Sequence, residues 1–406
     1  MITTEVNKID VSKLKVVPHE QKKYPALELC VYGEVPEDIK SWISTNVLLH
    51  YKSGPYTNII IPEGIVLNDL FTINKKFTYM DGFSPNLNKN LHIGHFANLV
   101  TAKSLKNLNC CQDVLSIYGD TEQRDITKIE ALKKLEEYYT WFDYCPDIEL
   151  YASGMKYTGN LLVDGTGEFE GCKVVKVGDE QVVAIKSDGT TSYFYQDIAL
   201  AEKLNANTLY IVGKEQENHF NLLKKIFPTV HHLALGLIKI DGKKMASRNG
   251  NVIYLDQFLE KIKNDFPDIK GITLYNLAYN IFAGLILRST VESDKNIDMT
   301  TLDNPKNSPG LYISYTMARL HSSGVNNYAG FAFKSTTLQY LRIKSINSLN
   351  PIYLFDGVLN LCNNINSLYK THQIKDNPEN LKMFSELYTD LLYGVKILGM
   401  FKIEKV

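Results

Sequence analysis

The feature that most restricts the fold of this chain is a regular alternation of apolar and amphipathic stretches, which begins at Phe77. The strand-like stretch "FTYMDGF" is followed by a helix-like segment from about Gly94 to Leu108, then by "DVLSIYG" and by a second helix-like segment, "DITKIEALKKLEEYYTWF". The alternation resumes in "QDIALAEKLN", "TLYIVG", "ENHFNLLKKIF" and "HHLALGLIKI". Strands and helices in this order are typical of a parallel, doubly wound sheet, so we expect an α/β fold.

Changes in composition divide the chain into three expected domains. Residues 1–75 mix short strand-like runs with one predicted helix near "EDIKSWISTNVLL", which indicates a small N-terminal α+β appendage. Residues 76–256 form the α/β domain, and a glycine-punctuated stretch at about 150–192 predicts a β-rich insertion in it. Residues 257–406 are predicted to form a C-terminal all-α bundle, apart from a polar segment near 323–350.

Composition and charge argue against several classes of protein. The stretch "MITTEVNKIDVSKLK" has no apolar core, and no later run reaches the about 18 apolar residues that cross a bilayer, so we expect a cytoplasmic protein with no membrane partner. The six cysteines have neither a CxxC pair nor a zinc-like spacing, so we expect no zinc. The net charge of −1 gives no general nucleic-acid signal, although residues 306–406 hold 11 Lys and Arg against 6 Asp and Glu.

The first candidate motif is "HIGH", which falls where the first strand gives way to the first helix. Helix N-termini at such junctions present unpaired N–H groups to anions. Gly94 has no side chain to block a flat base or ribose, and His92 and His95 can donate hydrogen bonds to phosphate oxygens. A histidine at a helix start is more often a surface or satisfied residue, so the motif alone is a moderate signal.

The second candidate motif is "DGKKMASRNGN", after the strand-like stretch "LALGLIKI". A lysine-rich turn flanked by glycines is usually a solvated loop. Here Lys243, Lys244, Ser247 and Arg248 would instead form a cationic flap that neutralises charge on a triphosphate when its α-phosphorus is attacked. Both motifs together, in this order on an α/β sheet, favour nucleotide chemistry.

With these motifs the sequence resembles the class I aminoacyl-tRNA synthetases, and among them the arginyl-tRNA synthetases. "HIGH" is similar to the first signature of the class and "KMASR" to a variant of the second. The flanking stretches that resemble arginyl enzymes are "SPNLNKNLHIGH", "YFYQDIALA", "VGKEQENHF", "LGLIKIDGKKMASRNGNVIYLDQFL" and "LYISYTMARLH". The resemblance covers most of residues 77–325. It implies a Rossmann-like catalytic domain and a helical region that contacts the tRNA stem and anticodon.

The resemblance also implies a reaction and its residues. Arginine and ATP would form arginyl-adenylate, and the arginyl group would pass to tRNA, with Mg²⁺ accompanying ATP. The catalytic residues would be His92, His95 and Lys244. The ATP-binding residues would be His92, Gly94, His95, Lys243, Lys244, Ser247 and Arg248. The arginine-binding residues would be Asp81, Ser84, Asn86, His92, Tyr193, Asp197 and Gln216. Arg319 would contact tRNA, and we expect a monomer.

The expected arginine pocket suits its ligand, since a guanidinium is a planar fork of donors best met by carboxylates, amide oxygens and an aromatic face. The residues of this kind are Asp81, Asn86, Tyr193, Asp197 and Gln216. Simpler interpretations exist for three of them. Asp197 could cap the following helix, Tyr193 could lie in a core strand, and Gln216 could lie on a surface turn.

The sequence also departs from the arginyl pattern in several places. Asp81 stands where the family usually has glutamate, and the stretch "YGDTEQRD" keeps only Asp120 and Gln123 of a longer family motif. Residues 1–75 do not resemble the N-terminal domain of these enzymes, and 323–350 is a short start for their anticodon-binding bundle. Arginine activation is therefore better supported than tRNA charging.

Three alternatives stay open from the sequence. A synthetase-like ligase could pass an activated amino acid to an acceptor other than tRNA, as the trimmed RNA-binding regions suggest. A nucleotidyltransferase could also carry a His-x-Gly-His element, although such enzymes normally lack the KMASR-type flap. A catalytically inactive descendant is disfavoured because both nucleotide motifs are intact.

Overall fold

The structure is a computed structural model of the 406-residue chain. It describes residues 14–16, 27–32, 35, 40, 44, 49–67, 71, 73, 76–120, 127–240, 242–245, 252–325, 332–375 and 377–406. Within this part of the chain, no helix combines the length and the apolar character needed to cross a bilayer.

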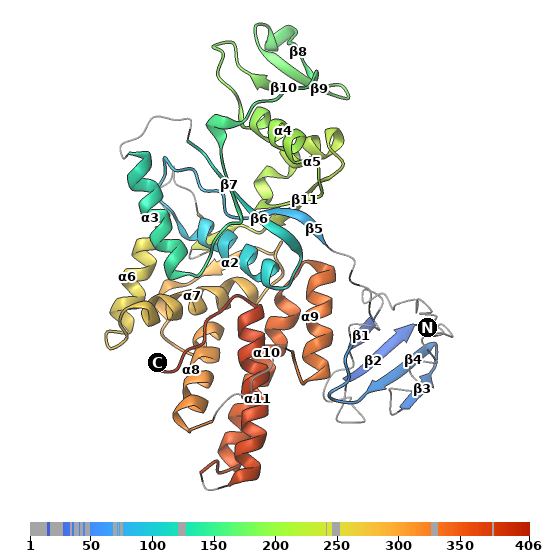
Figure 1. Ribbon diagram of the computed structural model, residues 1–406, viewed down its shortest axis with the longest axis vertical. Helices are drawn as coiled ribbons and strands as arrows, with labels where there is room; N and C mark the ends of the chain where they lie inside the picture. The colour runs from blue at the N-terminus through green and yellow to red at the C-terminus, as the bar shows by residue number, and fades with distance from the viewer. Residues whose placement is uncertain are drawn as a thin grey trace.

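The centre of the molecule is a parallel sheet of five strands, counted over the described residues. The strands are β5 (Phe77–Asp81), β6 (Cys111–Tyr118), β7 (Ile148–Tyr151), β11 (Thr208–Gly213) and β12 (Val230–Leu235). Their spatial order is β12-β11-β5-β6-β7. The predicted parallel, doubly wound sheet is therefore confirmed, and Figure 1 shows it across the middle of the molecule.

Four helices of the described residues lie between these strands in the chain: α2 (Ile93–Asn107), α3 (Lys128–Trp141), α4 (Tyr193–Leu204) and α5 (Glu217–Ile226). α2 packs on β6 and β11, and α5 packs on β12. α6 (Leu255–Asp265) follows the sheet and packs on α2 and α7. The ring of Phe96 in α2 stacks on Phe282 with centroids 4.6 Å apart, and Trp141 at the end of α3 stacks on Tyr275 at 4.1 Å. These rings join the central domain to the helices that follow it, so both share one hydrophobic core.

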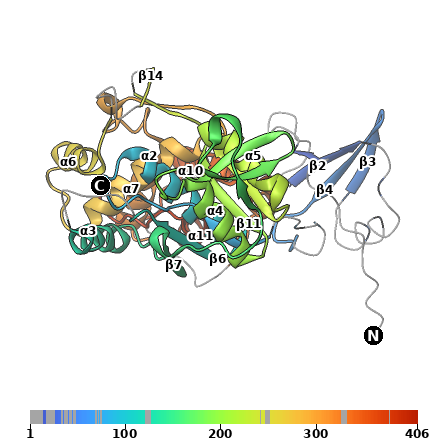
Figure 2. The same cartoon turned by 90° about the horizontal axis from the view of Figure 1, so that it is seen from above.

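Two small sheets extend from the central domain. The insertion contains β8 (Leu162–Asp164), β9 (Lys173–Val177) and β10 (Glu180–Ile185), with the 3-10 turns η3 (Ala152–Gly154) and η4 (Gly167–Phe169). Its strands are antiparallel and lie at the top of Figure 1, beyond α4. The second sheet contains β13 (Ile238–Ile240), β14 (Lys243–Lys244) and β15 (Lys295–Ile297), in the order β14-β13-β15. β14 projects at the edge of the molecule in Figure 2.

The C-terminal part is largely helical, as predicted. It contains α7 (Ile272–Leu287), α8 (Pro309–Ser322), α9 (Thr336–Ser348), α10 (Ile352–Thr371) and α11 (Pro378–Ile397), with the short turn η7 (Met299–Thr301). The expectation was wrong in two details. Residues 295–297 form a strand because they pair with β13, and much of the polar segment near 323–350 is helix α9.

Residues near the C-terminal end pack against α2 of the central domain. The Nδ2 of Asn107 donates to the carbonyl of Lys396 at 2.9 Å, and the ammonium of Lys103 lies 4.1 Å from the ring centre of Phe401. Asn280 of α7 holds the Phe401 backbone through two hydrogen bonds of 2.8 Å. The segment after α11 therefore closes the core beneath α2.

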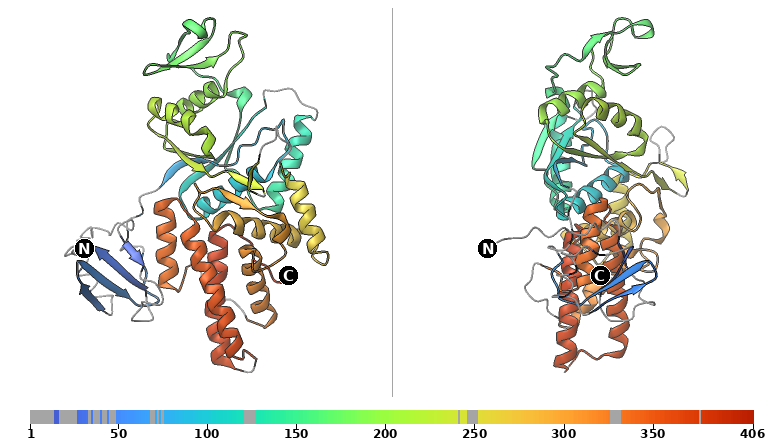
Figure 3. Two further views of the ribbon diagram at one scale, coloured as in Figure 1. Left: turned by 180° about the vertical axis from the view of Figure 1, so that it is seen from behind. Right: turned by 90° about the vertical axis from the view of Figure 1, so that its right-hand side faces the viewer.

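The N-terminal sheet stands beside the helical part (Figure 3). It contains β1 (Leu14–Val16), β2 (Leu27–Tyr32), β3 (Leu49–Ser53) and β4 (Tyr56–Ile61), all antiparallel in the order β1-β2-β4-β3. Phe71 packs edge-on against Tyr340 of α9. The carboxylate of Glu63 accepts a hydrogen bond of 2.6 Å from the backbone amide of Thr336. The helix predicted near residues 37–49 falls almost wholly outside the described residues, and its last position begins β3.

Candidate active site

The predicted site lies where the winding direction of the central sheet changes. The chain places β6 and β7 on one side of β5 and then returns to place β11 and β12 on the other side. The switch point is therefore between β5 and β11, which end at Asp81 and Gly213. In open α/β sheets, ligands bind in the crevice outside the carboxyl ends of the strands at such a point.

The two histidines of the first motif cap helix α2, a role that the sequence did not predict. The Nδ1 of His92 accepts hydrogen bonds from the backbone N–H of Gly94 at 3.1 Å and of His95 at 3.4 Å. In return, the Nδ1 of His95 accepts from the backbone N–H of His92 at 3.2 Å. The two rings stack with their centroids 3.8 Å apart. The pair thus forms a capping box in which imidazoles replace the usual hydroxyl and carboxylate.

This arrangement determines which nitrogen of each imidazole ring carries the proton. Because each Nδ1 accepts a hydrogen bond, a neutral imidazole here carries its proton on Nε2. Burial lowers the pKa of His92, and burial together with the adjacent His92 lowers the pKa of His95 to about 3. Both rings are therefore neutral at pH 7, and each has an Nε2–H group that can donate to a phosphate oxygen.

The structure brings the two nucleotide motifs into contact. A Cβ atom at Gly94 would lie 2.9 Å from the His92 ring and 2.9 Å from the Cε of Met245, so a larger residue there would displace one of these side chains. The backbone of Leu91 accepts from the Leu255 amide at 2.9 Å, which holds the chain after the second motif beside the first. The two motifs, about 150 positions apart in the sequence, thus lie next to each other in the fold.

The lysines of the second motif lie at the edge of this site. Lys243 and Lys244 form β14, where both are exposed and pair with β13 in an antiparallel hairpin. Ser247 and Arg248, the other expected members of the cationic flap, lie outside the described residues.

Asp81 is a buried carboxylate at the end of β5. It accepts a hydrogen bond from the Ser84 hydroxyl, and the Oγ of Ser84 accepts the Ile117 amide at 2.7 Å. Burial, opposed by the Ser84 hydrogen bond and reinforced by the charge of Asp197, raises the pKa of Asp81 to about 7. Asp197, the other acid of the predicted arginine pocket, is therefore close enough for its charge to affect the ionisation of Asp81.

Asp197 lies in the second turn of α4 and is held by His219, which the sequence analysis missed. The Nε2 of His219 is 2.6 Å from the Oδ2 of Asp197. The cap of α4 is instead Ser192, whose hydroxyl accepts the Tyr195 amide at 3.2 Å. The capping interpretation of Asp197 is therefore wrong. The histidine of "ENHF" was visible as a polar residue in a half-apolar helix, but nothing local linked it to α4.

The other expected pocket residues lie around the same strand ends. Tyr193 is the first residue of α4 and is exposed, so it is not a strand residue of the core. Gln216 is exposed on η5 (Lys214–Gln216), the turn directly after β11, which agrees with the surface-turn interpretation. Asn86 lies beside Gly119 at the end of β6, and its Oδ1 accepts the Asn88 amide at 2.8 Å.

Two buried tyrosines near Asp81 were also missed by the sequence analysis. Tyr210 lies opposite Asp81 in the register of β11 and β5. Among the described residues, the hydroxyls of Tyr210 and Tyr144 are buried without a hydrogen-bond partner. Burial raises the pKa of both tyrosines, and the charge of Asp81 contributes to both shifts. A tyrosine in the aliphatic stretch "TLYIVG" was the signal that could have found one of them.

Arg319, expected to contact tRNA, makes contacts within the helical part. Its guanidinium donates to Asn366 at 2.8 Å and to the Tyr315 hydroxyl at 2.9 Å, and it lies 5.0 Å from the ring centre of Tyr369. These contacts join α8 to α10.

Two further expectations concern Asp120 and metal binding. Asp120 pairs with Lys128 at 2.6 Å and accepts the Ser153 amide at 2.9 Å, so it organises the chain after β6, while Gln123 lies outside the described residues. Over the ranges that the structure describes, no three His, Cys, Asp or Glu side chains gather to hold a metal ion. The absence of zinc stays a prediction.

Comparisons with known proteins agree with this geometry. Residues 160–268 match the family "tRNA synthetases class I (R), catalytic domain". The arginine–tRNA ligase of Lactobacillus acidophilus is 31% identical over 182 residues, which cover 38% of this chain and 32% of that protein. The arginine–tRNA ligase of Limosilactobacillus fermentum is 27% identical over 233 residues, or 48% of this chain and 42% of that protein. The chain thus spans about a third to two fifths of the length of these curated relatives.

Solved structures show the same fold over a larger part of the chain. The arginyl-tRNA synthetase of Thermus thermophilus matches with a TM-score of 0.64 and 14% identity, covering 97% of this chain and 96% of that one. The enzyme of Plasmodium falciparum matches with a TM-score of 0.60 and 16% identity, covering 91% and 88%. Residues 160–268 are therefore similar to the catalytic domain of class I tRNA synthetases, and the chain has the fold of the solved arginyl-tRNA synthetases. The curated relatives and solved structures named above are arginyl-tRNA synthetases, so the predicted resemblance is confirmed.

Proposed function

We propose that the protein is an arginine–tRNA ligase, which joins arginine to ATP as arginyl-adenylate, releases pyrophosphate, and transfers the arginyl group to tRNA. The observation that carries the proposal is the carboxylate of Asp81, buried at the end of β5 beside Asp197, with its pKa raised to about 7. A raised pKa means that ionising the buried carboxylate costs free energy. A cationic ligand between two acids favours their ionised forms and offsets that cost. A guanidinium is the amino-acid side chain that best matches two carboxylates at once.

The surrounding residues support a pocket for arginine. Asp81 and Asp197 would receive the guanidinium. Gln216, in the turn after β11, and Tyr193, at the start of α4, would border it. The buried hydroxyls of Tyr144 and Tyr210 add polar groups near Asp81. Ser84 and Asn86, with His92, would hold the α-amino end of the substrate.

The chemistry of activation requires no covalent bond to the protein. The arginine carboxylate attacks the α-phosphorus of ATP in line, and pyrophosphate leaves with the electron pair of the broken P–O bond. Catalysis then depends on positioning and on stabilising the added charge of the transition state. His92 and His95 would donate their Nε2–H groups to phosphate oxygens, and Lys244 would place its ammonium against the same charge. Mg²⁺ would bind together with ATP, coordinated by its phosphates.

The acceptor, the partners and the cellular location are proposed with the activity. The helical part, with its excess of lysines, would bind tRNA as a polyanion. Because Arg319 has partners within the helices, we propose that it orders this surface and that exposed lysines contact the RNA. A monomeric, cytoplasmic enzyme remains our expectation.

Pyrophosphate exchange with each of the standard amino acids, with and without bulk tRNA, tests the proposal, followed by charging of tRNA with the amino acid that exchanges. We expect exchange with arginine and arginylation of tRNA. Exchange with arginine but no charging would favour a ligase with a different acceptor. The class I synthetase family match supports a ligase over a nucleotidyltransferase, and absence of exchange with any amino acid would contradict the ligase.

A further inference from the structure

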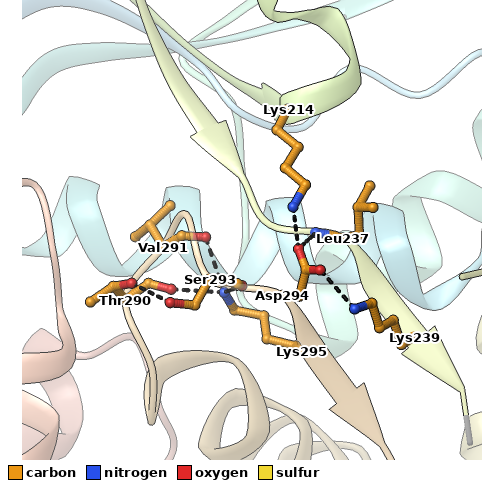
Figure 4. Close-up of polar contacts among 8 residues, drawn as sticks. All are labelled: Lys214, Leu237, Lys239, Thr290, Val291, Ser293, Asp294 and Lys295. Carbon is orange, nitrogen blue, oxygen red and sulfur yellow. Dashed lines mark hydrogen bonds and ion pairs between the residues drawn. The ribbon is translucent and has the colours of Figure 1, made fainter. Parts of the chain in front are cut away.

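Asp294 joins three parts of the chain that are far apart in the sequence (Figure 4). Its Oδ1 accepts hydrogen bonds from the Lys214 ammonium at 2.5 Å and from the Leu237 amide at 3.0 Å, and its Oδ2 lies 2.9 Å from the Lys239 ammonium. Hydrogen bonds between ionised groups are stronger than hydrogen bonds between neutral groups. The two lysines and the Leu237 amide hold the pKa of Asp294 well below its usual range, so the carboxylate is ionised at neutral pH.

The backbone that carries Asp294 is fixed by the next residue. The buried Lys295 donates its ammonium hydrogens to the carbonyl oxygens of Thr290 at 2.9 Å, Val291 at 3.0 Å and Ser293 at 2.7 Å, as Figure 4 shows. A lysine ammonium has three N–H groups, and all three are used here. The turn before β15 therefore has one defined geometry.

This turn lies directly against the chain that leads to the second motif. A Cβ atom at Gly236 would lie 2.0 Å from the carbonyl oxygen of Ser293, so a larger residue would force the two segments apart. The Gly236 amide donates to the Val291 carbonyl at 3.0 Å, and the Lys295 amide donates to Leu237 at 2.9 Å. Asp294 thus contacts a part of the structure that cannot shift freely.

Both lysines that bind Asp294 belong to elements of the proposed site. Lys214 begins η5, the turn that ends with the pocket residue Gln216. Lys239 lies in β13 directly opposite Lys244 of β14. Opposite residues of antiparallel strands share a face, and like charges there destabilise the pair. The carboxylate of Asp294 offsets this repulsion by neutralising Lys239.

We propose that Asp294 is a positioning residue that fixes the β13–β14 hairpin, and with it Lys244, relative to the arginine-pocket turn η5. The role rests on the proposed function to the extent that Lys244 acts on ATP. Asp294 acts through Lys239 on the hairpin and through Lys214 on the pocket turn. Loss of the Lys239 contact should therefore change kcat, and loss of the Lys214 contact should change the KM for arginine.

The test compares Asp294→Asn, Lys239→Met and Lys214→Met in the full-length protein. In arginine-dependent pyrophosphate exchange we expect Asp294→Asn and Lys239→Met to lower kcat roughly 3- to 30-fold. The double variant that combines these two changes should have a kcat no lower than that of either single variant. Lys214→Met should mainly raise the KM for arginine. Asp294→Glu keeps the charge and should recover part of the loss. Asp164→Asn, which breaks a comparable exposed pair with Lys173 in the insertion, is the matched control and should match wild type.

Hydrogen exchange of the backbone amides of β13 and β14 gives a readout that does not depend on activity. We expect faster exchange of these amides in Asp294→Asn than in wild type, and no change in Asp164→Asn. Unchanged hairpin exchange in Asp294→Asn would overturn the proposal, as would additive losses of kcat in the double variant. If the wild-type protein did not exchange arginine at all, the proposed function would fail, and the hydrogen exchange alone would decide the role of Asp294.

Discussion

The imidazole of His219 in α5 holds the carboxylate of Asp197 in α4 at 2.6 Å. The His219 ring is itself packed edge-on against Phe194, with centroids 5.3 Å apart, so its direction is set by the hydrophobic contact between the two helices. The carboxylate therefore has a fixed orientation before any substrate binds. An acid that is already oriented loses less conformational entropy when it pairs with a ligand.

The first prediction concerns this pair. His219→Ala should raise the KM for arginine in pyrophosphate exchange by about 10-fold or more, because a hydrogen bond to a charged group is worth roughly 1.5 to 3 kcal/mol. The kcat should change little. His219→Gln places an amide N–H near the position of Nε2 and should recover part of the affinity. His321→Ala, which removes a surface histidine beside Glu404, serves as the control. A KM within twofold of wild type in His219→Ala would mean that Asp197 does not need this partner.

The second prediction separates the two roles of His95. His95→Asn keeps an acceptor near the position of Nδ1 for the His92 amide but has no group at Nε2, whereas His95→Ala loses both. Both variants should lower the kcat of adenylate formation roughly 100- to 1,000-fold, as should Lys244→Ala. Only His95→Ala should also lose about 1 kcal/mol of unfolding free energy, the value of a helix cap. Wild-type kcat in His95→Asn would show that the imidazole serves only as a cap.

The third prediction follows from the pKa of Asp81. The folded-state pKa of about 7 lies above the ordinary value of 3.8, so folding favours the protonated acid. The cost of ionising Asp81 is absent below about pH 4, grows between pH 4 and 7, and is complete above pH 7. Asp81→Asn should therefore raise the unfolding free energy by about 2 to 4 kcal/mol at pH 8 and by almost nothing at pH 4. Denaturant unfolding at both pH values measures this difference.

The same variant should abolish arginine activation, since the amide cannot neutralise the guanidinium. Binding of arginine to the wild-type protein should release a proton and tighten as the pH rises through 7, because the ligand favours the ionised carboxylate. Calorimetry in two buffers of different ionisation enthalpy measures the proton release. A stability gain that did not depend on pH would place the pKa of Asp81 near its ordinary value.

The fourth prediction concerns substrate choice. Lysine cannot satisfy the acceptors of both acids, and citrulline would leave a buried carboxylate without a counter-charge. A site built on such polar pairing can discriminate by about 10,000-fold or more. Arginine should support exchange while lysine, citrulline and ornithine scarcely do, and Asp197→Asn should remove most of the activity. Canavanine is the analogue most able to replace arginine, because Asp81 is shorter than the glutamate usual at this position in arginyl-tRNA synthetases and leaves more room. Faster exchange with another standard amino acid would refute the pocket.

The fifth prediction concerns the RNA surface. Lys370, Lys375 and Lys382 are exposed around the turn between α10 and α11. Changing all three to Glu should weaken tRNA retention in a gel-shift assay and reduce the salt dependence of binding, since each lost phosphate contact lowers the slope by about 0.9. The matched control changes the exposed Lys173, Lys176 and Lys186 of the insertion. Equal weakening by both triple variants would point to general charge rather than to a site on the bundle.

Local patterns in the sequence were sufficient to predict the elements of the catalytic domain. The helix expected from about Gly94 to Leu108 is α2, Ile93–Asn107, because apolar residues at helical spacing depend only on near neighbours. The parallel, doubly wound arrangement followed from general rules for alternating strands and helices, whereas the strand order was not predicted. Helix α9 was missed because its apolar residues are interrupted by polar ones, so that it lacks a clear apolar stripe.

The partners of the site residues could not be predicted in this way. His219 and Asp197 lie 22 positions apart on different helices, and Lys214 and Asp294 lie 80 positions apart. Their contacts depend on how β11, β13 and β15 are placed, which no local pattern contains. The histidine capping box was hidden for another reason. Histidine is not a usual capping residue, so "HIGH" was placed at a helix start without any indication that its side chains cap that helix.

The packing of the last helix against α2 has a consequence for how the protein is made. Asn107, at the end of the helix that bears His95, hydrogen-bonds the backbone 289 positions later in the chain. A ribosome that adds about 5 to 20 residues per second needs roughly 15 to 60 s to synthesise that interval. Throughout this time the underside of α2 lacks its final cover. Helix α2 is thus synthesised long before this contact can form, so a nascent chain stalled before residue 396 would carry His92 and His95 on an incomplete core.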